Sequence, residues 1–545
     1  MNYHIMTIKK LAKQIVTASL IILPFFSEAQ QIGQEQHFKI LKGEQWYGGT
    51  VDEGSQAPYQ AGYNFDLFRN NNDNQSAPLL LSSSGRYIWS NQPFKFSISK
   101  DEVIISDNLD SVTMHTSGKT LADAFNSASH AQFKASGLMP DSLLFASPQY
   151  NTWIELVYNQ NQTDILKYAH SIIDNGFPPG VLMIDDNWAD YYGKFAFRKD
   201  RFPDAKQMIT ELHQMGFKVM VWVSPFISSD TQIFRELNDN RLLIMDSKGD
   251  KDLKWQDASK PAIISWWNGY SSCLDFTNPA AQTWYRGQLD SMMSNYGVDG
   301  FKFDAGDIEF YTGDILTYQK KNANEQCELW GSMGAYFKLN EYRAMWKRGG
   351  QPLAERLRDK KHNWTDLKKL IPNITAAGLL GYQFTCPDMI GGGEYGSFIG
   401  LAKYDQDLVV RSAECSALMP MMQFSVAPWR ILDKEHLAAV KTAVQIRKKY
   451  TPYILQTVKE SAKSGEPVIR NLEYVFPGQD LSAIKDQFML GNRLMVAPVL
   501  DKTTTRTIVF PKGKWKGQDG KIFKGPLKAT INAAIGELPA FDKID

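Results

Sequence analysis

The sequence feature that most constrains the fold is a regular alternation of short apolar segments and amphipathic segments between residues 141 and 455. The apolar segments have the length of buried strands, and the amphipathic ones repeat their apolar residues with the period of a helix. We expect strands at 152–157, 180–185, 218–223, 300–304 and 352–354, and helices at 164–175, 205–215, 279–296 and 335–347. Repeated strand–helix units over this length predict an α/β fold, a parallel (β/α)8 TIM barrel with an outer ring of helices.

Strand-like sequence flanks the predicted barrel on both sides. Residues 30–140 alternate apolar and polar residues in short runs separated by turn residues, which predicts an N-terminal β-sandwich. Similar runs return in residues 456–545, where we expect a smaller C-terminal β-sandwich domain. Residues 224–273 have weak periodicity and many turn residues, so we expect an insertion after the third barrel strand.

The first 29 residues have the order of a secretory signal peptide. Lys9, Lys10 and Lys13 precede an apolar run at 15–26, and small residues follow before Gln30. The run is short for a bilayer span, so we expect cleavage and export to the periplasm or medium, with no stable membrane insertion afterwards. An uncleaved anchor is the alternative interpretation.

Composition excludes several classes of partner. The 545 residues hold 60 Lys plus Arg against 59 Asp plus Glu, so no basic excess points to nucleic acid. Aromatic residues make up 12% of the chain, which suits stacking against sugars, although a large aromatic core explains most of them. The four cysteines, at 273, 327, 386 and 415, fit no zinc pattern. Free buried thiols are the favoured interpretation, and a disulfide is the alternative.

Candidate catalytic residues follow three of the predicted strands, because reactive groups of a parallel barrel lie at the carboxyl ends of its strands. The first group is Asp185, Asp186 and Trp188. Two adjacent carboxylates are costly when buried, but they can accept hydrogen bonds from substrate hydroxyls beside an apolar indole. A helix N-cap or a solvated loop is the competing explanation.

The second group is Lys302 and Asp304, which lie two residues apart and therefore leave their strand on the same side. A carboxylate beside an ammonium group in a barrel mouth can be an ionised nucleophile. A structural salt bridge is the alternative.

The third group is Arg356, Asp359 and Asp388. A second carboxyl group opposite the nucleophile is what acid/base assistance to a leaving alcohol requires. Arg and Lys neighbours surround Asp359, so its role as an acid needs local desolvation or the charge of the nucleophile nearby.

These motifs resemble those of glycoside hydrolase family 31, retaining α-glycosidases with a TIM barrel between β-sandwich domains. The family's nucleophile motif, roughly Asp-Gly-Phe-x-x-Asp, matches residues 299–304, and the resemblance therefore implies that Asp304 is the nucleophile. Further similar segments are 198–204, 275–279 and 381–392, and the likeness covers nearly the whole chain after the signal peptide.

The resemblance also implies an acid/base residue. In the family this Asp usually follows Gly and precedes a Trp by five positions, and Asp359 precedes Trp364 by five, with Arg358 in place of the Gly. Arg356 falls near the family's substrate-binding Arg. Asp366 is the rival, although it begins an amphipathic helix, where a first-turn carboxylate has a structural role.

Departures from the family pattern suggest the sugar. Family α-glucosidases usually carry Trp or another non-basic residue where Lys302 stands, and they tend to have a late Arg-x-His motif that is missing from residues 424–430. The pattern is similar to a branch with bacterial α-galactosidases and the animal myogenesis-regulating glycosidase. Families 27 and 36 also carry Lys two residues before the nucleophile, and in them an Asp pair binds the galactose 4- and 6-hydroxyls, as the resemblance implies for Asp185 and Asp186.

The resemblance therefore implies double displacement on a terminal α-galactosyl residue, with no cofactor or metal. The substrate is a small glycoside or an oligosaccharide with a terminal α-linked sugar, and Trp153, Trp188 and Trp222 could frame it. An α-glucosidase or α-xylosidase of the same family is the first alternative, and a non-catalytic carbohydrate-binding protein is the second. Transglycosylation remains open, because it differs only in the acceptor of the second step.

Overall fold

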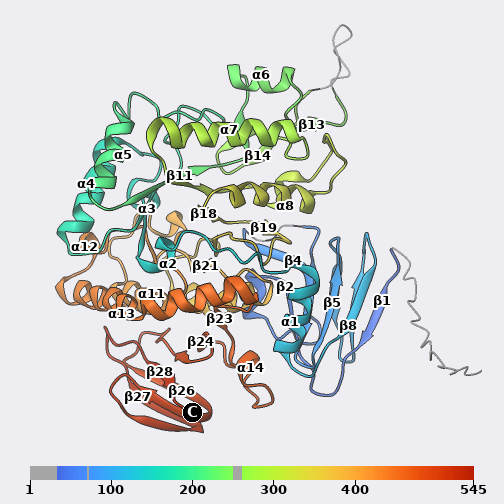
Figure 1. Cartoon of the computed structure of the whole chain (residues 1–545), viewed down its shortest axis with the longest axis vertical. Helices are drawn as coiled ribbons and strands as arrows, with labels where there is room; N and C mark the ends of the chain where they lie inside the picture. Colours follow the sequence, from blue (N-terminus) through green and yellow to red (C-terminus); the bar gives the residue numbers. More distant parts are fainter. Residues whose placement is uncertain (1–32, 70, 72, 250–259) are drawn as a thin grey trace, which may run out of the picture.

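The computed structural model describes residues 33–69, 71, 73–249 and 260–545 (Figure 1). The predicted signal peptide, residues 1–29, lies outside the described residues. At the centre, eight parallel strands follow one another in the order β21-β20-β18-β16-β11-β10-β9-β22. A parallel bridge between Met389 and Gln423 links the two ends of this sheet. The sheet is therefore a nearly closed barrel, as the sequence predicted.

The barrel strands are short and almost wholly buried, which explains their continuous apolar sequence. They are β9 (Gln149–Asn151), β10 (Val181–Ile184), β11 (Lys218–Val223), β16 (Gly300–Phe303), β18 (Leu339–Tyr342), β20 (Glu355–Arg356), β21 (Thr385–Cys386) and β22 (Gln423–Phe424). Each points its carboxyl end to the same face of the barrel, and the candidate residues gather there.

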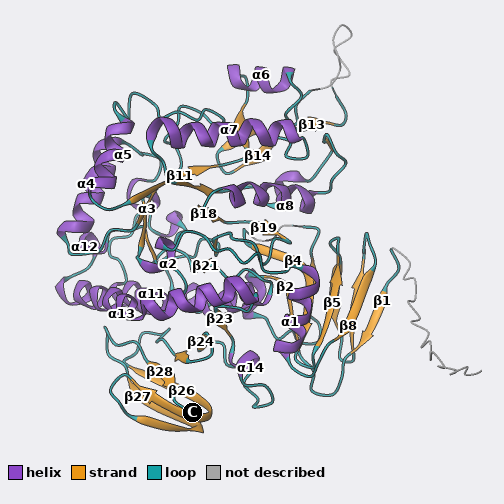
Figure 2. Cartoon of the chain, in the orientation of Figure 1, coloured by secondary structure: helices purple, strands orange, loops and turns teal. Residues whose placement is uncertain are grey.

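Helices surround the strands (Figure 2). They are α4 (Gln162–Asp174), α5 (Ala205–Gln214), α7 (Pro279–Tyr296), α8 (Ala323–Met333), α10 (Leu370–Leu379), α11 (Gln406–Ala417) and α13 (Lys434–Ser464). Side-chain caps fix where several of them begin, since Asn161, Asp204 and Asn278 each accept a hydrogen bond from a backbone N–H of the first turn. Pro279 at the first helical position of α7 completes this pattern.

Two predicted elements are wrong in type. The expected strand 152–157 is the short helix α3 (Trp153–Leu156), which follows β9. The expected helix 335–347 holds strands β18 and β19 (Met345–Trp346), and the helix of this unit, α8, comes earlier. Ala, Leu, Glu and Met in this segment favour a helix, but β18 pairs with β16 and β20 in the barrel. Tertiary pairing therefore outweighs the local preference. The strand expected at 352–354 is found immediately after these residues, as β20 (Glu355–Arg356).

Two sheets form the N-terminal region. One contains β1 (Gln36–Lys39), β7 (Glu102–Ser106), β6 (Lys95–Ile98) and β3 (Asn64–Asp66). The other contains β2 (Trp46–Thr50), β4 (Gln75–Ser82), β5 (Arg86–Ser90) and β8 (Val112–Thr116), followed by helix α1 (Leu121–Gln132). Strand β19 of the barrel segment adds to β4 in parallel, so this region is joined to the barrel by backbone hydrogen bonds.

The segment after β11 contains a small antiparallel sheet. It is formed by β12 (Phe226–Ser228), β15 (Gly269–Cys273) and β14 (Ile264–Trp266), with helix α6 (Gln232–Asp239) in the same segment. Residues 250–259 of this predicted insertion lie outside the described residues. Because Trp266 pairs with Gly269, the β14–β15 hairpin has a two-residue tip, Trp267 and Asn268.

The C-terminal strands form one antiparallel sheet of six rather than two separate sheets. They are β23 (Ile469–Arg470), β24 (Phe488–Leu490), β25 (Leu494–Val496), β28 (Ala540–Lys543), β26 (Thr505–Gly517) and β27 (Ile522–Asn532). Arg411 of α11 attaches this sheet to the barrel, because its Nη2 donates to the carbonyl oxygens of Thr503 and Ala533 at 2.9 and 2.7 Å.

All four cysteines are free and buried, as the favoured interpretation predicted. Among the described residues, no helix has both the length and the apolar character that a membrane crossing needs.

Candidate active site

The structure brings Asp304, the predicted nucleophile, to the carboxyl end of β16. Its Oδ2 accepts a hydrogen bond from Trp222 Nε1 at 2.7 Å, and its Oδ1 accepts one from the Ala305 N–H at 3.0 Å. Burial alone would raise the pKa of Asp304, but the charges of Arg343, Lys302 and Arg356 hold it well below its usual value. Asp304 is therefore ionised at neutral pH, and one of its carboxylate oxygens is held by the indole N–H of Trp222, as suits a nucleophile.

Arg343 is a site residue that the sequence analysis missed. Its Nε lies 3.4 Å from Asp304 Oδ1, and its Nη2 donates to Asp307 Oδ2 at 2.6 Å. The guanidinium group also lies over the ring of Trp267, at 4.5 Å from the centroid. Arg343 directly follows β18, and the incorrect prediction of a helix there hid its position at a strand end. A strand assignment for 339–342 would have revealed it.

Lys302 and Asp185 form a buried ion pair in the barrel mouth. Lys302 Nζ lies 2.7 Å from Asp185 Oδ2, and the two side chains are only 4% and 3% exposed. The Asp185 backbone N–H donates to Thr152 Oγ1 at 3.0 Å, which fixes the end of β10. The pair joins two strands that are separated by β11.

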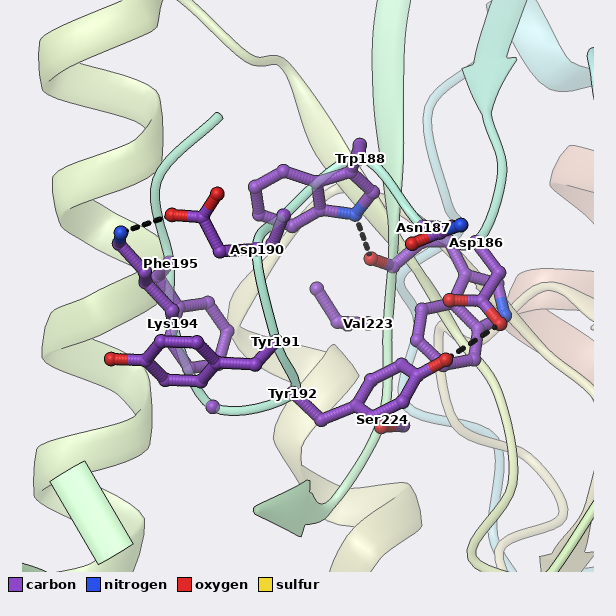
Figure 3. A pocket seen from close by; sticks show the side chains of 13 residues that line it. Asp186, Asn187, Trp188, Asp190, Tyr191, Tyr192, Lys194, Phe195, Val223 and Ser224 are labelled. Carbon is purple, nitrogen blue, oxygen red and sulfur yellow. Dashed lines mark hydrogen bonds and ion pairs between the residues drawn. The ribbon is translucent and has the colours of Figure 1, made fainter. Parts of the chain in front are cut away.

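Asp186 lies in a hydrogen-bonded network that is only half complete. Its Oδ2 accepts from Tyr192 Oη at 3.2 Å (Figure 3). The same oxygen accepts from Asn268 Nδ2 at 2.6 Å, while the buried Oδ1 has no hydrogen-bond partner among the described residues. Burial raises the pKa of Asp186 to about 7, and the charge of Asp185 adds to this effect. Neither Tyr192 nor Asn268 was predicted, because a lone Tyr or Asn in a loop carries no motif.

Arg356 of β20 holds the other two predicted carboxylates. Its Nη1 lies 2.5 Å from Asp359 Oδ1 and 2.9 Å from Asp388 Oδ1. Asp388 Oδ2 also accepts hydrogen bonds from the backbone N–H groups of Lys360 and Gly393, at 2.7 and 3.1 Å. The Asp359 side chain is 33% exposed and that of Asp388 only 1%, so Asp359 is the one that solvent and ligand can reach.

Glu341 of β18 lies behind this cluster and was also missed. Its Oε2 accepts from Gln423 Nε2 at 2.8 Å, and its Oε1 lies 3.6 Å from Arg356 Nε. Burial raises the pKa of Glu341 to about 7, although Arg356 and Lys302 oppose this. The position is hidden in the sequence for the same reason as that of Arg343.

The predicted tryptophans have different positions. Trp188 is buried, and its Nε1 donates to the Trp222 carbonyl oxygen at 2.7 Å. Both indoles line a cavity of about 80 Å³ beside Asp186, formed largely by the loop after β10 (Figure 3). Trp153 does not line this cavity. Its Nε1 donates to the carbonyl oxygen of Gly393 at 3.2 Å, and the Gly393 N–H donates to Asp388, so Trp153 lies near the Arg356 cluster, with its ring at 74° to that of Tyr395.

Asp366, the rival candidate for the acid/base role, has a structural position. It lies in the short helix α9 (Trp364–Leu367), where its Oδ2 accepts from the Lys361 N–H at 2.8 Å and its Oδ1 pairs with Lys369. The Lys361 and Lys369 partners stabilise its ionised form. The cluster around Arg356 contains Asp359 and does not contain Asp366.

A nearly closed parallel barrel with ionised and hydrogen-bonded carboxylates at its strand ends belongs to the class of TIM-barrel proteins, whose reactive residues lie at that face. Comparison with known proteins narrows the class. Residues 144–457 match the glycosyl hydrolases family 31 TIM-barrel domain, and residues 465–544 match the family 31 C-terminal domain. The chain therefore belongs to glycosyl hydrolase family 31.

Individual relatives agree with this assignment. The chain is 32% identical over 412 residues to the mouse myogenesis-regulating glycosidase, covering 73% of this chain and 56% of the relative. It is 24% identical over 418 residues to an α-glucosidase of Bacillus thermoamyloliquefaciens, covering 70% of this chain and 51% of the relative. The chain thus spans about half the length of these curated relatives.

A solved structure supports the fold. A family 31 α-xylosidase from a soil metagenome, complexed with xylose, superposes with a TM-score of 0.81 at 19% identity, over 93% of this chain and 79% of the other. At this identity the likeness concerns the fold alone.

Proposed function

We propose that this chain is an exported retaining α-glycosidase that removes terminal α-galactosyl residues. One observation carries the proposal: the Lys302–Asp185 pair and the adjoining Asp186, with its unpartnered Oδ1, lie at the strand ends next to the ionised Asp304. A buried carboxylate oxygen without a donor is costly, and a substrate hydroxyl would supply the missing hydrogen bond.

The chemistry follows from the roles of two carboxylates. Asp304 attacks the anomeric carbon while Asp359 protonates the leaving oxygen, which gives a β-linked glycosyl-enzyme. Asp359 then deprotonates a water molecule, whose oxygen attacks the anomeric carbon and displaces the Asp304 carboxylate, so that the product has the α configuration. The hydrogen bond from Trp222 to Oδ2 and the nearby guanidinium of Arg343 would keep the Asp304 carboxylate ionised and oriented before attack.

The proposed preference for galactose rests on the polar side chains at these strand ends. Galactose differs from glucose in an axial 4-hydroxyl, and a site rejects an epimer best when buried polar groups are then left unpaired. Lys302, Asp185 and Asp186 are buried and charged or hydrogen-bonding, and they supply both donors and acceptors. Asp388 and Arg356 supply a second polar wall, and Trp153, Trp188 and Trp222 the apolar surface.

Activity on α-glucosides or α-xylosides is the second candidate. It is favoured by two relatives of this chain, which are an α-glucosidase and an α-xylosidase. It would require the Lys302–Asp185 pair to bind an equatorial 4-hydroxyl.

Export is part of the proposal and rests on the sequence of residues 1–29. We expect the mature protein to begin at Gln30 and to be found outside the cytoplasm. N-terminal sequencing of the protein from a bacterial host would check this, and an intact N-terminus in the soluble cytoplasmic fraction would contradict it.

The function is tested with matched 4-nitrophenyl α-glycosides of galactose, glucose and xylose. We expect the galactoside to be hydrolysed with the highest kcat/KM, and the Asp304→Asn variant to lose at least about 10³-fold of that activity. Preference for glucose or xylose would overturn the galactose assignment. Turnover by Asp304→Asn equal to that of the wild-type protein would overturn the assignment of Asp304 as the nucleophile. NMR identification of the anomer that is released first would test retention of configuration independently.

A further inference from the structure

The β14–β15 hairpin reaches the site from outside the set of barrel strands. Its two-residue tip lies between Trp266 and Gly269, and Gly269 takes a positive φ of 104° that few other residues adopt. Trp267 of the tip stacks on Arg343, and Asn268 contacts Asp186. The tip therefore contacts two charged groups of the proposed site directly, Arg343 and Asp186.

The carboxamide of Asn268 has a defined orientation. Its Oδ1 accepts a hydrogen bond from Tyr158 Oη at 2.9 Å, and its Nδ2 donates to Asp186 Oδ2 at 2.6 Å and to Tyr192 Oη at 2.8 Å. A rotated amide would place an oxygen against the Asp186 carboxylate and lose both donor contacts. The hydrogen bond from Tyr158 thus fixes the orientation of the Asn268 carboxamide, and Asn268 in turn fixes the orientation of the Asp186 carboxylate.

We infer that Asn268 is a positioning residue that holds Asp186 in the ionised form and rotamer needed to accept a sugar hydroxyl at its free Oδ1. The inference rests on the proposed function in one respect, namely that Asp186 binds a substrate hydroxyl. It deepens that function by placing part of the sugar selectivity in an inserted hairpin outside the barrel strands.

The charge balance around Asp186 explains why a positioning residue is needed. The titratable groups that face Asp186 are Asp185 of the same strand end, Tyr158 and Tyr192, and Lys302 is already paired with Asp185. Burial and Asp185 favour the protonated form of Asp186, whereas the backbone N–H of Asn187 and the side chains of Asn268 and Tyr192 favour the ionised form. A protonated Asp186 would turn one acceptor oxygen into a donor and change which hydroxyl arrangement fits.

The experiment compares Asn268→Ala and Asn268→Asp with the wild-type full-length protein. The Ala variant removes the donor, and the Asp variant keeps the shape but turns a carboxylate oxygen toward Asp186. We measure kcat/KM for 4-nitrophenyl α-galactoside between pH 5 and pH 9. The loss of a hydrogen bond to a charged group should raise the pKa of Asp186 and move the acidic limb of the profile upward by about one pH unit. The defect should therefore be about tenfold larger at pH 6 than at pH 9, and at least as large in the Asp variant.

Two controls separate positioning from a structural role. Tyr270→Ser changes the same hairpin at a side chain that is 74% exposed and should leave both the rate and the profile unchanged. In an Asp186→Asn background, Asn268→Ala should cost little more, because the group through which it acts is gone. A loss that is uniform across pH, or additive with Asp186→Asn, would overturn the inference.

Failure of the proposed function would look different. If wild-type protein prefers the glucoside, the galactose assignment fails, and the pH profile and the double-variant comparison are then measured with the glucoside. Coupling between Asn268 and Asp186 on that substrate would still support the positioning role, and its absence would overturn it.

Discussion

Lys302 Nζ lies 2.7 Å from Asp185 Oδ2, so two residues 117 positions apart in the sequence form one buried pair across the barrel mouth. Each side chain is almost inaccessible to solvent, and each charge depends on the other for compensation. The pair therefore links the stability of the barrel to the proposed sugar site.

The Lys302→Met variant should test this link. It leaves Asp185 as an uncompensated buried carboxylate, which we expect to lower the free energy of unfolding by about 3–5 kcal/mol and to abolish galactoside preference. Urea denaturation followed by fluorescence measures the first effect. Lys524→Met, at an exposed position of β27, is the control and should change the free energy of unfolding by less than about 0.5 kcal/mol. Equal stability of the two variants would contradict the prediction.

The Arg343→Met variant should change the pH dependence of activity. Arg343 is the strongest of the cations that hold the pKa of Asp304 down against burial, so its removal raises that pKa. Attack requires ionised Asp304, so the acidic limb that Asp304 sets, which lies below the limb set by Asp186, should move to higher pH and steepen the loss of kcat/KM in acid. Arg343→Lys keeps a charge and should move the limb less, and Arg286→Met at a half-exposed helix position should not move it. An unchanged limb in Arg343→Met would show that Arg343 does not act on the nucleophile.

The Asp359→Ala variant should reveal an acid/base role through the leaving group. We expect about 10²–10⁴-fold lower kcat/KM for an α-galactosyl disaccharide, and a smaller loss for 4-nitrophenyl α-galactoside, whose leaving group needs little protonation. Added azide should restore turnover and give the α-galactosyl azide. Asp366→Ala should show neither the leaving-group dependence nor the azide rescue. If Asp366→Ala shows both and Asp359→Ala shows neither, the acid/base role belongs to Asp366.

The Gly393→Ala variant should damage the site without unfolding the barrel. A Cβ at this position would lie 2.7 Å from Asp388 Oδ1 and 2.9 Å from Asp359 Oδ1, which is too close for either oxygen. We expect both carboxylates to shift and kcat/KM to fall by about tenfold or more, since small misplacements of catalytic groups are costly. Gly287→Ala in helix α7 is the matched control and should retain full activity, because an added Cβ would meet no other described side chain or segment within 4 Å. The thermal unfolding temperature should change little in both variants. Equal kcat/KM of Gly393→Ala and Gly287→Ala would contradict the prediction.

Local pattern was enough to predict the barrel and most carboxylates of the site. Strand and helix periods repeat along residues 141–455, and strand ends at 184 and 303 place Asp185, Asp186 and Asp304 in the mouth. The two-residue spacing of Lys302 and Asp304 predicted that both would face inward, because side chains alternate along a strand. These features depend on neighbouring residues only, so a sequence carries them directly.

Contacts between distant segments were decided by the tertiary structure alone. Residues 335–347 favour a helix locally, yet pairing with β16 and β20 makes Leu339–Tyr342 a strand and brings Arg343 to Asp304. Asn268 reaches Asp186 only because the inserted hairpin folds over the barrel, 82 residues away along the chain. The physical reason is that burial, parallel pairing and charge compensation act between segments, and their free energies exceed the weak preferences that a local stretch of sequence expresses.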